Sequence, residues 1–184
     1  MTTLPSVNTI ADGTAVKTPG SNIFPYIKKN LDDIITVEDD ELIVAFLDMV
    51  ENHKMIVENS GLLTVAALKH LGVKDKRVVS ILSGGNMDVI TMSSVVQQGL
   101  IFRDRIFTVS VLLPDKPGEL AKVSQTLADV QGNVIKLEHN QFVTTNRSAA
   151  VELRITLECF GTEHKEQIIA ALEKKGYKQE LYAL

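Results

Sequence analysis

The stretch Phe107-Thr-Val-Ser-Val-Leu-Leu-Pro-Asp-Lys-Pro-Gly-Glu-Leu120 decides the fold of the second half of the chain. Apolar side chains alternate with Thr108 and Ser110, which predicts a strand with one buried and one hydrated face. Proline and glycine then break the strand, and an apolar stripe with helical spacing follows at Leu120, Val123, Leu127 and Val130. The stretch therefore predicts a strand, a tight loop and an amphipathic helix.

The residues after this helix contain the same kinds of element. Gly132-Asn133 is a turn signal, and strands are predicted over residues 134–139 and 151–157. An amphipathic helix over residues 162–175 is stopped by Gly176, and a last strand follows over residues 177–181. The resulting order, βαββαβ, is that of a ferredoxin-like sandwich of one sheet and two helices.

The first hundred residues have a different hydrophobic pattern, in which short apolar runs alternate with helical stretches. Helices or helical turns are predicted over residues 12–16, 23–31, 38–52 and 60–72, and strands over residues 33–37, 55–57 and 77–82. This alternation favours parallel βα units and an α/β fold. The sequence pattern changes near residues 98–105, and this change predicts two domains, 1–102 and 103–184.

The composition excludes several classes of function. The 184 residues are 45% hydrophobic and 23% charged, with a net charge of -4. No basic stripe is present to neutralise phosphates, so nucleic acid is not expected as a partner. No apolar run spans a bilayer and no signal peptide is recognisable at the start, which makes the cytoplasm the expected location. The single cysteine, Cys159, follows a strand pattern and is expected to be a buried, inert thiol.

A short polar loop, Ser83-Gly84-Gly85-Asn86, ends the apolar run at residues 77–82. In open α/β sheets, ligands bind outside the carboxyl ends of the strands, which is where this loop is expected. Taken alone, the tetrapeptide is more typical of a strand-ending turn that binds nothing.

Residues 106–182 resemble the ACT domain, a small βαββαβ module that binds amino acids. Its loop between first strand and first helix is matched by Asp115, Lys116, Pro117, Gly118, Glu119 and Leu120. Residues 4–102 resemble the last third of the catalytic domain of threonine ammonia-lyase (threonine dehydratase), a fold-type II enzyme that uses pyridoxal phosphate. The segments that carry this second resemblance are residues 7–13, 32–37, 57–58 and 82–86.

The second resemblance implies cofactor contacts. It places Ser83 at the pyridine nitrogen of pyridoxal phosphate, and it implies that Gly84 and Gly85 let the backbone approach the ring while Asn86 orients the loop. Glu58 resembles a glutamate of the family that lies near the cofactor ring. An equally open alternative is that Glu58 only caps the chain at Ser60 or Gly61. His53 and His70 lack partners at metal-ligand spacing and are expected to bind no metal.

The resemblance to ACT domains implies an effector site shared by two chains. Backbone N–H groups near Pro117 and Gly118 would bind the effector carboxylate at the helix start, facing Asn133 and Val134 across a domain pair. Isoleucine or valine is the expected effector, and the chain is expected to form a homo-oligomer through this domain. The alternative is an ACT domain that serves only as an assembly surface.

The chain departs from the lyase family in two motifs. The family forms its Schiff base through a lysine in a Ser-Phe-Lys-x-Arg-Gly type motif and binds the cofactor phosphate with a separate glycine-rich loop, and neither motif occurs here. The chain is therefore expected to be the carboxyl-terminal portion of such an enzyme, partnered by the missing portion and inactive by itself. The competing interpretation is a non-catalytic module that binds amino acids or only dimerises.

Overall fold

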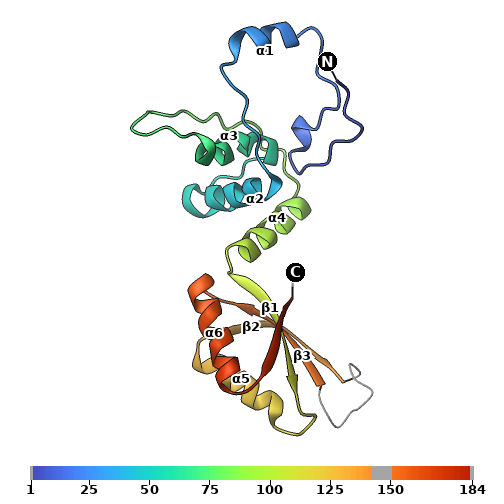
Figure 1. Cartoon of the computed structure of the whole chain (residues 1–184), viewed down its shortest axis with the longest axis vertical. Helices are drawn as coiled ribbons and strands as arrows, with labels where there is room; N and C mark the ends of the chain where they lie inside the picture. The colour runs from blue at the N-terminus through green and yellow to red at the C-terminus, as the bar shows by residue number, and fades with distance from the viewer. Residues whose placement is uncertain (1, 142–150, 183–184) are drawn as a thin grey trace. The chain divides into compact units, whose positions relative to one another are not determined.

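The computed structural model describes residues 2–141 and 151–182. The chain forms two units, Met1–Gly99 and Leu100–Leu184, which are described separately below (Figure 1).

The carboxyl-terminal unit contains a four-stranded antiparallel sheet and two helices. Its elements are β1 (Ile106–Leu113), α5 (Glu119–Asp129), β2 (Asn133–Asn140), β3 (Val151–Glu158), α6 (Thr162–Lys174) and β4 (Lys178–Tyr182). The strands lie in the order β2-β3-β1-β4. Both helices pack against one face of the sheet (Figure 1). The predicted βαββαβ order and ferredoxin-like fold are therefore confirmed.

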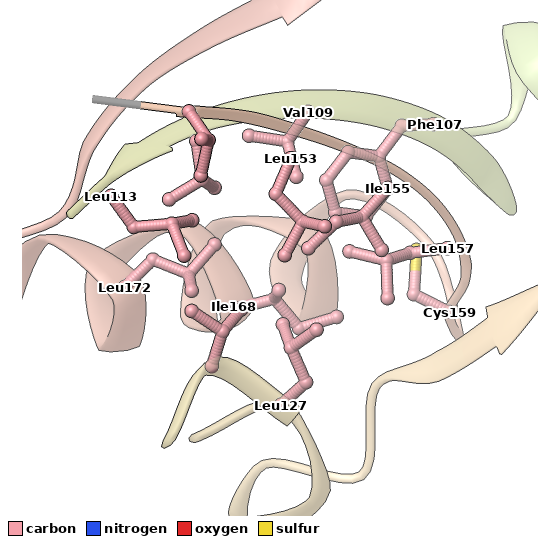
Figure 2. Close-up of a cluster of buried hydrophobic side chains, with 13 residues drawn as sticks. Phe107, Val109, Leu113, Leu127, Leu153, Ile155, Leu157, Cys159, Ile168 and Leu172 are labelled. Carbon is pink, nitrogen blue, oxygen red and sulfur yellow. The ribbon is translucent and has the colours of Figure 1, made fainter. Parts of the chain in front are cut away.

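The core of this unit is built from alternate residues of the strands. Val109, Leu153 and Ile155 are fully buried and point toward Leu127 of α5 and Ile168 of α6 (Figure 2). Burying an aliphatic side chain of this size contributes about 1.5–3 kcal/mol, so this layer supplies much of the stability of the unit. The period-two pattern in the sequence predicts these buried positions correctly. The expectation that the other face is hydrated is wrong for Thr108 and Ser110, which are 2% and 6% exposed.

The amino-terminal unit is helical and irregular in the part of the chain that is described. Its helices are α1 (Phe24–Asn30), α2 (Asp39–Asp48) and α3 (Leu63–Ala66), with short 3-10 or π turns at Asp12–Thr14, Met49–His53, Asn59–Leu62 and Ala67–His70. Helix α4 (Val89–Phe102) begins in this unit and ends beyond its boundary at Gly99. Phe46 of α2 is completely buried among Leu42, Leu62 and Val95.

Charged residues define the start of α2. The Glu38 backbone N–H donates to Glu41 Oε2 (2.9 Å), which completes a capping box. Lys69 and His70 also bind the Glu41 carboxylate, and the hydrogen bond from Lys69 is the main reason that the pKa of Glu41 falls to about 2. Glu38 is therefore the N-cap of the helix that the sequence predicts to begin at this residue.

The three strands predicted for this unit are not formed within the described residues. Residues 33–37, 55–57 and 77–82 form neither helix nor strand and join no sheet. The last of them was expected to be covered on both faces, yet Val79 is 89% exposed and Ile81 is 71% exposed. A β-strand forms only when it is hydrogen-bonded to a neighbouring strand. These segments have a strand-like sequence, but they pair with no strand among the described residues.

One predicted helix is divided, and one helix was not predicted. The helix expected from Ser60 to Gly72 is divided into two 3-10 turns around the single turn of α3, and Ser60 lies inside the first turn instead of capping a helix. The sequence pattern also missed α4, although its start carries a clear capping residue. The Asp88 carboxylate accepts hydrogen bonds from the Ile90 N–H (2.8 Å) and from the Thr91 side chain.

Candidate functional site

The polar loop and the glutamate that the sequence singled out lie together in the amino-terminal unit. Glu58 Oε2 accepts a hydrogen bond from the Asn86 N–H at 3.1 Å, and the Glu58 N–H points to the Gly84 carbonyl oxygen at 3.5 Å. The Glu58 side chain therefore holds the loop and does not cap the 3-10 turn that follows it. The structure brings these predicted residues into one place.

Two glycines permit this close packing. Gly84 has a left-handed φ of +78°, and a Cβ atom there would lie 2.1 Å from Glu58 Cδ. A Cβ atom on Gly61 would lie 1.8 Å from the Ser83 carbonyl oxygen. Both contacts are far shorter than van der Waals contact, so any side chain would displace the Ser83 turn. Gly85, by contrast, faces open space.

A hollow of about 420 Å³ lies beside Glu58 and Asn86. Its lining contains the carboxylates of Asp12, Glu58 and Asp88 and contains no lysine or arginine. The Thr91 side chain, which donates to Asp88, is the main reason that the pKa of Asp88 lies below its ordinary value. The hollow is therefore an acidic environment.

These features fit one part of pyridoxal phosphate and not another. The exposed Ser83 hydroxyl can meet a pyridine nitrogen, and the loop of Gly84 and Gly85 leaves room for a flat ring. The acidic hollow would repel a phosphate dianion. The described residues therefore fit the ring edge of the cofactor, and the phosphate requires a site elsewhere.

The second predicted site is a loop at one end of the carboxyl-terminal sheet. Residues 115–118 are exposed and lead into α5, whose N-cap Gly118 has a left-handed φ of +92° with open space around it. Glu119 pairs with Lys122 at 2.7 Å on the first turn of this helix. Leu120 is 41% exposed and is the one member of the predicted apolar stripe that does not pack in or against the core.

The remaining predicted effector residues lie at the opposite end of this sheet. Asn133 and Val134 begin β2, where Asn133 Nδ2 donates to Glu158 at 3.0 Å. Glu158 lies opposite Ile106 at the start of β1, whereas the loop follows Leu113 at the end of β1. A single chain therefore does not bring Asn133 to the 115–120 loop.

Sequence reasoning missed a polar cluster on the face of the sheet away from the helices. Glu152 is 6% exposed, and it accepts hydrogen bonds from Ser110 (2.7 Å), Asn140 (3.0 Å) and Tyr182 (3.2 Å). Arg154 approaches the same carboxylate at 3.4 Å. Asn140 and then Ser110 contribute most to holding the pKa of Glu152 below its ordinary value. Alternation predicts that these side chains face away from the core, but not that they converge.

Cys159 and His70 each have a hydrogen-bond partner in the structure. Cys159 is buried, and burial raises the pKa of its thiol, which donates to the Asp104 carbonyl oxygen at 2.7 Å. His70 binds Glu41, and no cluster of metal-ligating side chains occurs within residues 2–141 and 151–182. None of the helices in the described ranges is long and apolar enough to cross a membrane.

Known proteins resemble both units. Residues 1–84 match the family model described as pyridoxal-phosphate dependent enzyme, and residues 107–176 match that of the ACT domain. The chain is 37% identical to an L-threonine ammonia-lyase of Geobacter sulfurreducens over 95% of its own length and 44% of that protein. It is 33% identical to an L-threonine ammonia-lyase of Thermotoga maritima, over 92% of the chain and 43% of that protein.

Among solved structures, one similar protein is the processed form of threonine deaminase isoform 2 from Solanum lycopersicum. The identity is 29% and the TM-score is 0.49, over 52% of this chain and 29% of that one. The chain spans less than half the length of the two curated relatives described above.

Proposed function

Residues 1–84 belong to the pyridoxal-phosphate dependent enzymes and residues 107–176 to the ACT domains, and from this premise we propose that the chain is the carboxyl-terminal portion of a threonine ammonia-lyase with an amino-acid-responsive ACT domain. The whole enzyme would convert threonine to 2-oxobutanoate and ammonia in isoleucine biosynthesis. The observation that carries this proposal is similarity to L-threonine ammonia-lyases over nearly the whole chain. We place the boundary between the catalytic part and the ACT part at residues 102 and 103.

In the proposed enzyme this chain supplies one wall of the cofactor pocket. Bound pyridoxal phosphate supplies an electron sink for reactions at the α-carbon of an amino acid. The Ser83 hydroxyl would hydrogen-bond the pyridine nitrogen without holding a proton on it as a carboxylate would, which favours prompt loss of the β-hydroxyl. Glu58 and Asn86 would keep the Ser83 turn in place, because their hydrogen bond joins the loop to the preceding segment. In the proposed enzyme, residues outside this sequence would supply the reactive lysine and the phosphate-binding loop.

In the carboxyl-terminal unit, the loop at residues 115–120 would bind a branched amino acid, isoleucine or valine. Its backbone N–H groups at the start of α5 would face the effector carboxylate. Asn133 and Val134 of a second chain would complete the site, and this shared position would couple effector binding to assembly. The separation of the two sets of residues within one chain supports a site that needs a partner.

One observation favours a second candidate function, a non-catalytic regulatory module. The four strands of the carboxyl-terminal sheet pair with one another, whereas residues 33–37, 55–57 and 77–82 of the amino-terminal unit join no sheet within the described residues. An ACT unit that folds by itself can bind an amino acid or dimerise without any catalytic part.

Calorimetric titration of the purified chain with isoleucine, valine and threonine tests the proposal, with molar mass followed by light scattering. Saturable binding of a branched amino acid with a change in mass is expected. Gly118→Ala should weaken binding, because a φ of +92° is strained for alanine. Gly176→Ala, at a φ of +83° and also in open space, is the matched control and should bind normally.

The same samples test the catalytic part of the proposal. With pyridoxal phosphate and threonine added, the chain alone should form no 2-oxobutanoate, and steady turnover would contradict the assignment of the reactive lysine to other residues. Absence of binding heat for all three amino acids would leave the ACT unit as an assembly surface only.

A further inference from the structure

Phe160 is the most exposed aromatic side chain among the described residues. It lies in the turn between β3 and α6 and is 77% exposed, whereas the core of this unit buries Phe107. The Phe160 ring stacks on the His164 ring, with centroids 5.0 Å apart and ring planes 15° apart. The hydrophobic core therefore does not use the Phe160 ring, which a neighbouring side chain holds on the surface.

Two hydrogen bonds fix the His164 ring. The Phe160 N–H donates to His164 Nδ1 at 3.1 Å, so Nδ1 carries no proton. His164 Nε2 lies 2.7 Å from the Val130 carbonyl oxygen, which can only accept, so Nε2 carries the proton and is the donor. The imidazole in this arrangement is therefore neutral. It supports one face of Phe160 without adding positive charge, and the other face is open to solvent.

A hollow of about 500 Å³ lies beside these two rings. Asp129 and Glu163 line it, together with Gln131 and Gln167. None of the described residues in the lining is a lysine or an arginine. The carboxyl end of α5 and the first turn of α6 both border the hollow, so their opposite helix dipoles offset each other. The hollow therefore combines an aromatic wall with a net negative charge.

A flat organic cation with several hydrogen-bond donors suits this lining. A guanidinium group is planar, stacks on aromatic rings and carries several N–H donors along its edge. When it lies on the open face of Phe160, its edge can donate to the carboxylates of Asp129 and Glu163. An ammonium group can approach the ring but cannot stack on it. A phosphate or carboxylate ligand would meet two like charges, so the lining favours a guanidinium group.

We propose that the hollow beside Phe160 binds the guanidinium group of arginine, as the free amino acid or as a residue of a partner chain. Phe160 supplies the stacking surface, and the two carboxylates supply the opposite charge. The site lies at the end of the sheet away from the loop at residues 115–120, because Cys159 bonds to Arg105 just before β1, whereas the loop follows β1. The inference therefore does not rest on the proposed effector site. Because its groups are exposed, the site should bind a single arginine with a Kd on the order of millimolar.

NMR spectroscopy of the isotope-labelled full chain tests the proposal, with amide chemical shifts followed during titration. Arginine should shift the amides of Phe160, His164 and Gln131 in a saturable way. Citrulline, the neutral isostere of arginine, should cause no saturable shift, and lysine should bind at least about threefold more weakly. Binding of N-acetylarginine amide with the same Kd would assign the site to an arginine residue of a partner chain. Loss of binding with that derivative would assign the site to the free amino acid.

Substitutions of exposed residues remove each contact separately, and the same amide spectra show that the variants are folded. Phe160→Leu should raise the Kd for arginine at least about threefold, whereas Phe160→Tyr keeps an aromatic face and should leave it within about twofold. Glu163→Gln should raise the Kd about two- to fivefold. Glu166→Gln is the matched control, because Glu166 is exposed on the same helix and does not line the hollow. Citrulline binding as tight as that of arginine, equal effects of the two glutamate substitutions, or no saturable shift with arginine would overturn the proposal.

Discussion

Replacing the buried carboxylate of Glu152 should weaken the carboxyl-terminal unit, and the contacts around it set the size of the effect. Glu152→Gln keeps the shape but removes the charge that Ser110, Asn140, Tyr182 and Arg154 share. Hydrogen bonds to charged groups contribute about 1.5–3 kcal/mol each, and glutamine retains part of this acceptor capacity. We therefore expect the free energy of unfolding to fall by about 1–3 kcal/mol.

Urea unfolding measures this change, with amide hydrogen exchange in β3 assigning the transition to the carboxyl-terminal unit. Glu158→Gln is the matched control, because Glu158 is exposed on the same strand and face and accepts one bond, from Asn133 at 3.0 Å. The control should change the unfolding free energy by less than about 0.5 kcal/mol. Equal effects of the two substitutions would show that the convergence of donors on Glu152 contributes nothing.

The pH dependence has a defined sign. The pKa of Glu152 is lower in the folded chain than its ordinary value of 4.5, chiefly through Asn140 and Ser110. The folded state therefore binds the proton less readily than the unfolded state, and the stabilisation is present above about pH 4.5 and is lost as the pH falls further. The difference in stability between the parent chain and Glu152→Gln should shrink over that range. A difference that stays constant down to pH 3 would refute the reasoning.

Two other predictions concern the amino-terminal loop and the single thiol. Gly61→Ala should reduce the stability of the amino-terminal unit by about 1–3 kcal/mol, because its Cβ atom would meet the Ser83 carbonyl oxygen at 1.8 Å. Urea unfolding checks this, with Gly72→Ala, which faces open space, as a control that should leave stability unchanged or slightly raised. Cys159 should react with iodoacetamide far more slowly in the folded chain than in urea, because it is buried and burial raises its thiol pKa. Mass spectrometry measures this rate, and equal rates in both states would contradict the burial.

The carboxyl-terminal unit was predictable from its sequence because its elements find their partners within that unit. The alternation that places Val109 and Ile155 in the core is a local pattern, and β1 and β3 pair with each other directly. Gly176, with its φ of +83°, follows the end of α6 as the sequence indicated. In this unit the local sequence pattern and the strand pairing agree, so the pattern alone predicts the fold.

In the amino-terminal unit, the sequence pattern predicts a strand that does not form and does not predict helix α4. The run that contains Val79 and Ile81 has the composition of a buried strand, but composition does not supply a neighbouring strand. Helix α4 was missed because its apolar and hydroxyl residues lack a clear polar face, and only the Asp88 cap marks its start. A capping residue without an apolar stripe behind it does not predict a helix by itself.

The candidate sites were predicted unevenly for a related reason. The contact of Glu58 with the loop at Gly84 and Asn86 joins segments that follow two predicted strand ends, so their proximity could be anticipated. The convergence on Glu152 could not, because it depends on the register of three strands and on side chains from Asn140 to Tyr182. Register is a tertiary property that periodicity alone leaves open.

The position of β1 in the middle of its sheet has a consequence for how the chain folds during synthesis. β1 leaves the ribosome before every other strand of the unit, yet Thr108 pairs with Thr156 on one side and with Tyr182 on the other. Strand β1 can therefore pair on both sides only after residues far along the chain have been synthesised. Contacts between residues so distant in sequence slow folding. Until β4 emerges, one side of β1 remains an open edge that is vulnerable to association with other nascent chains.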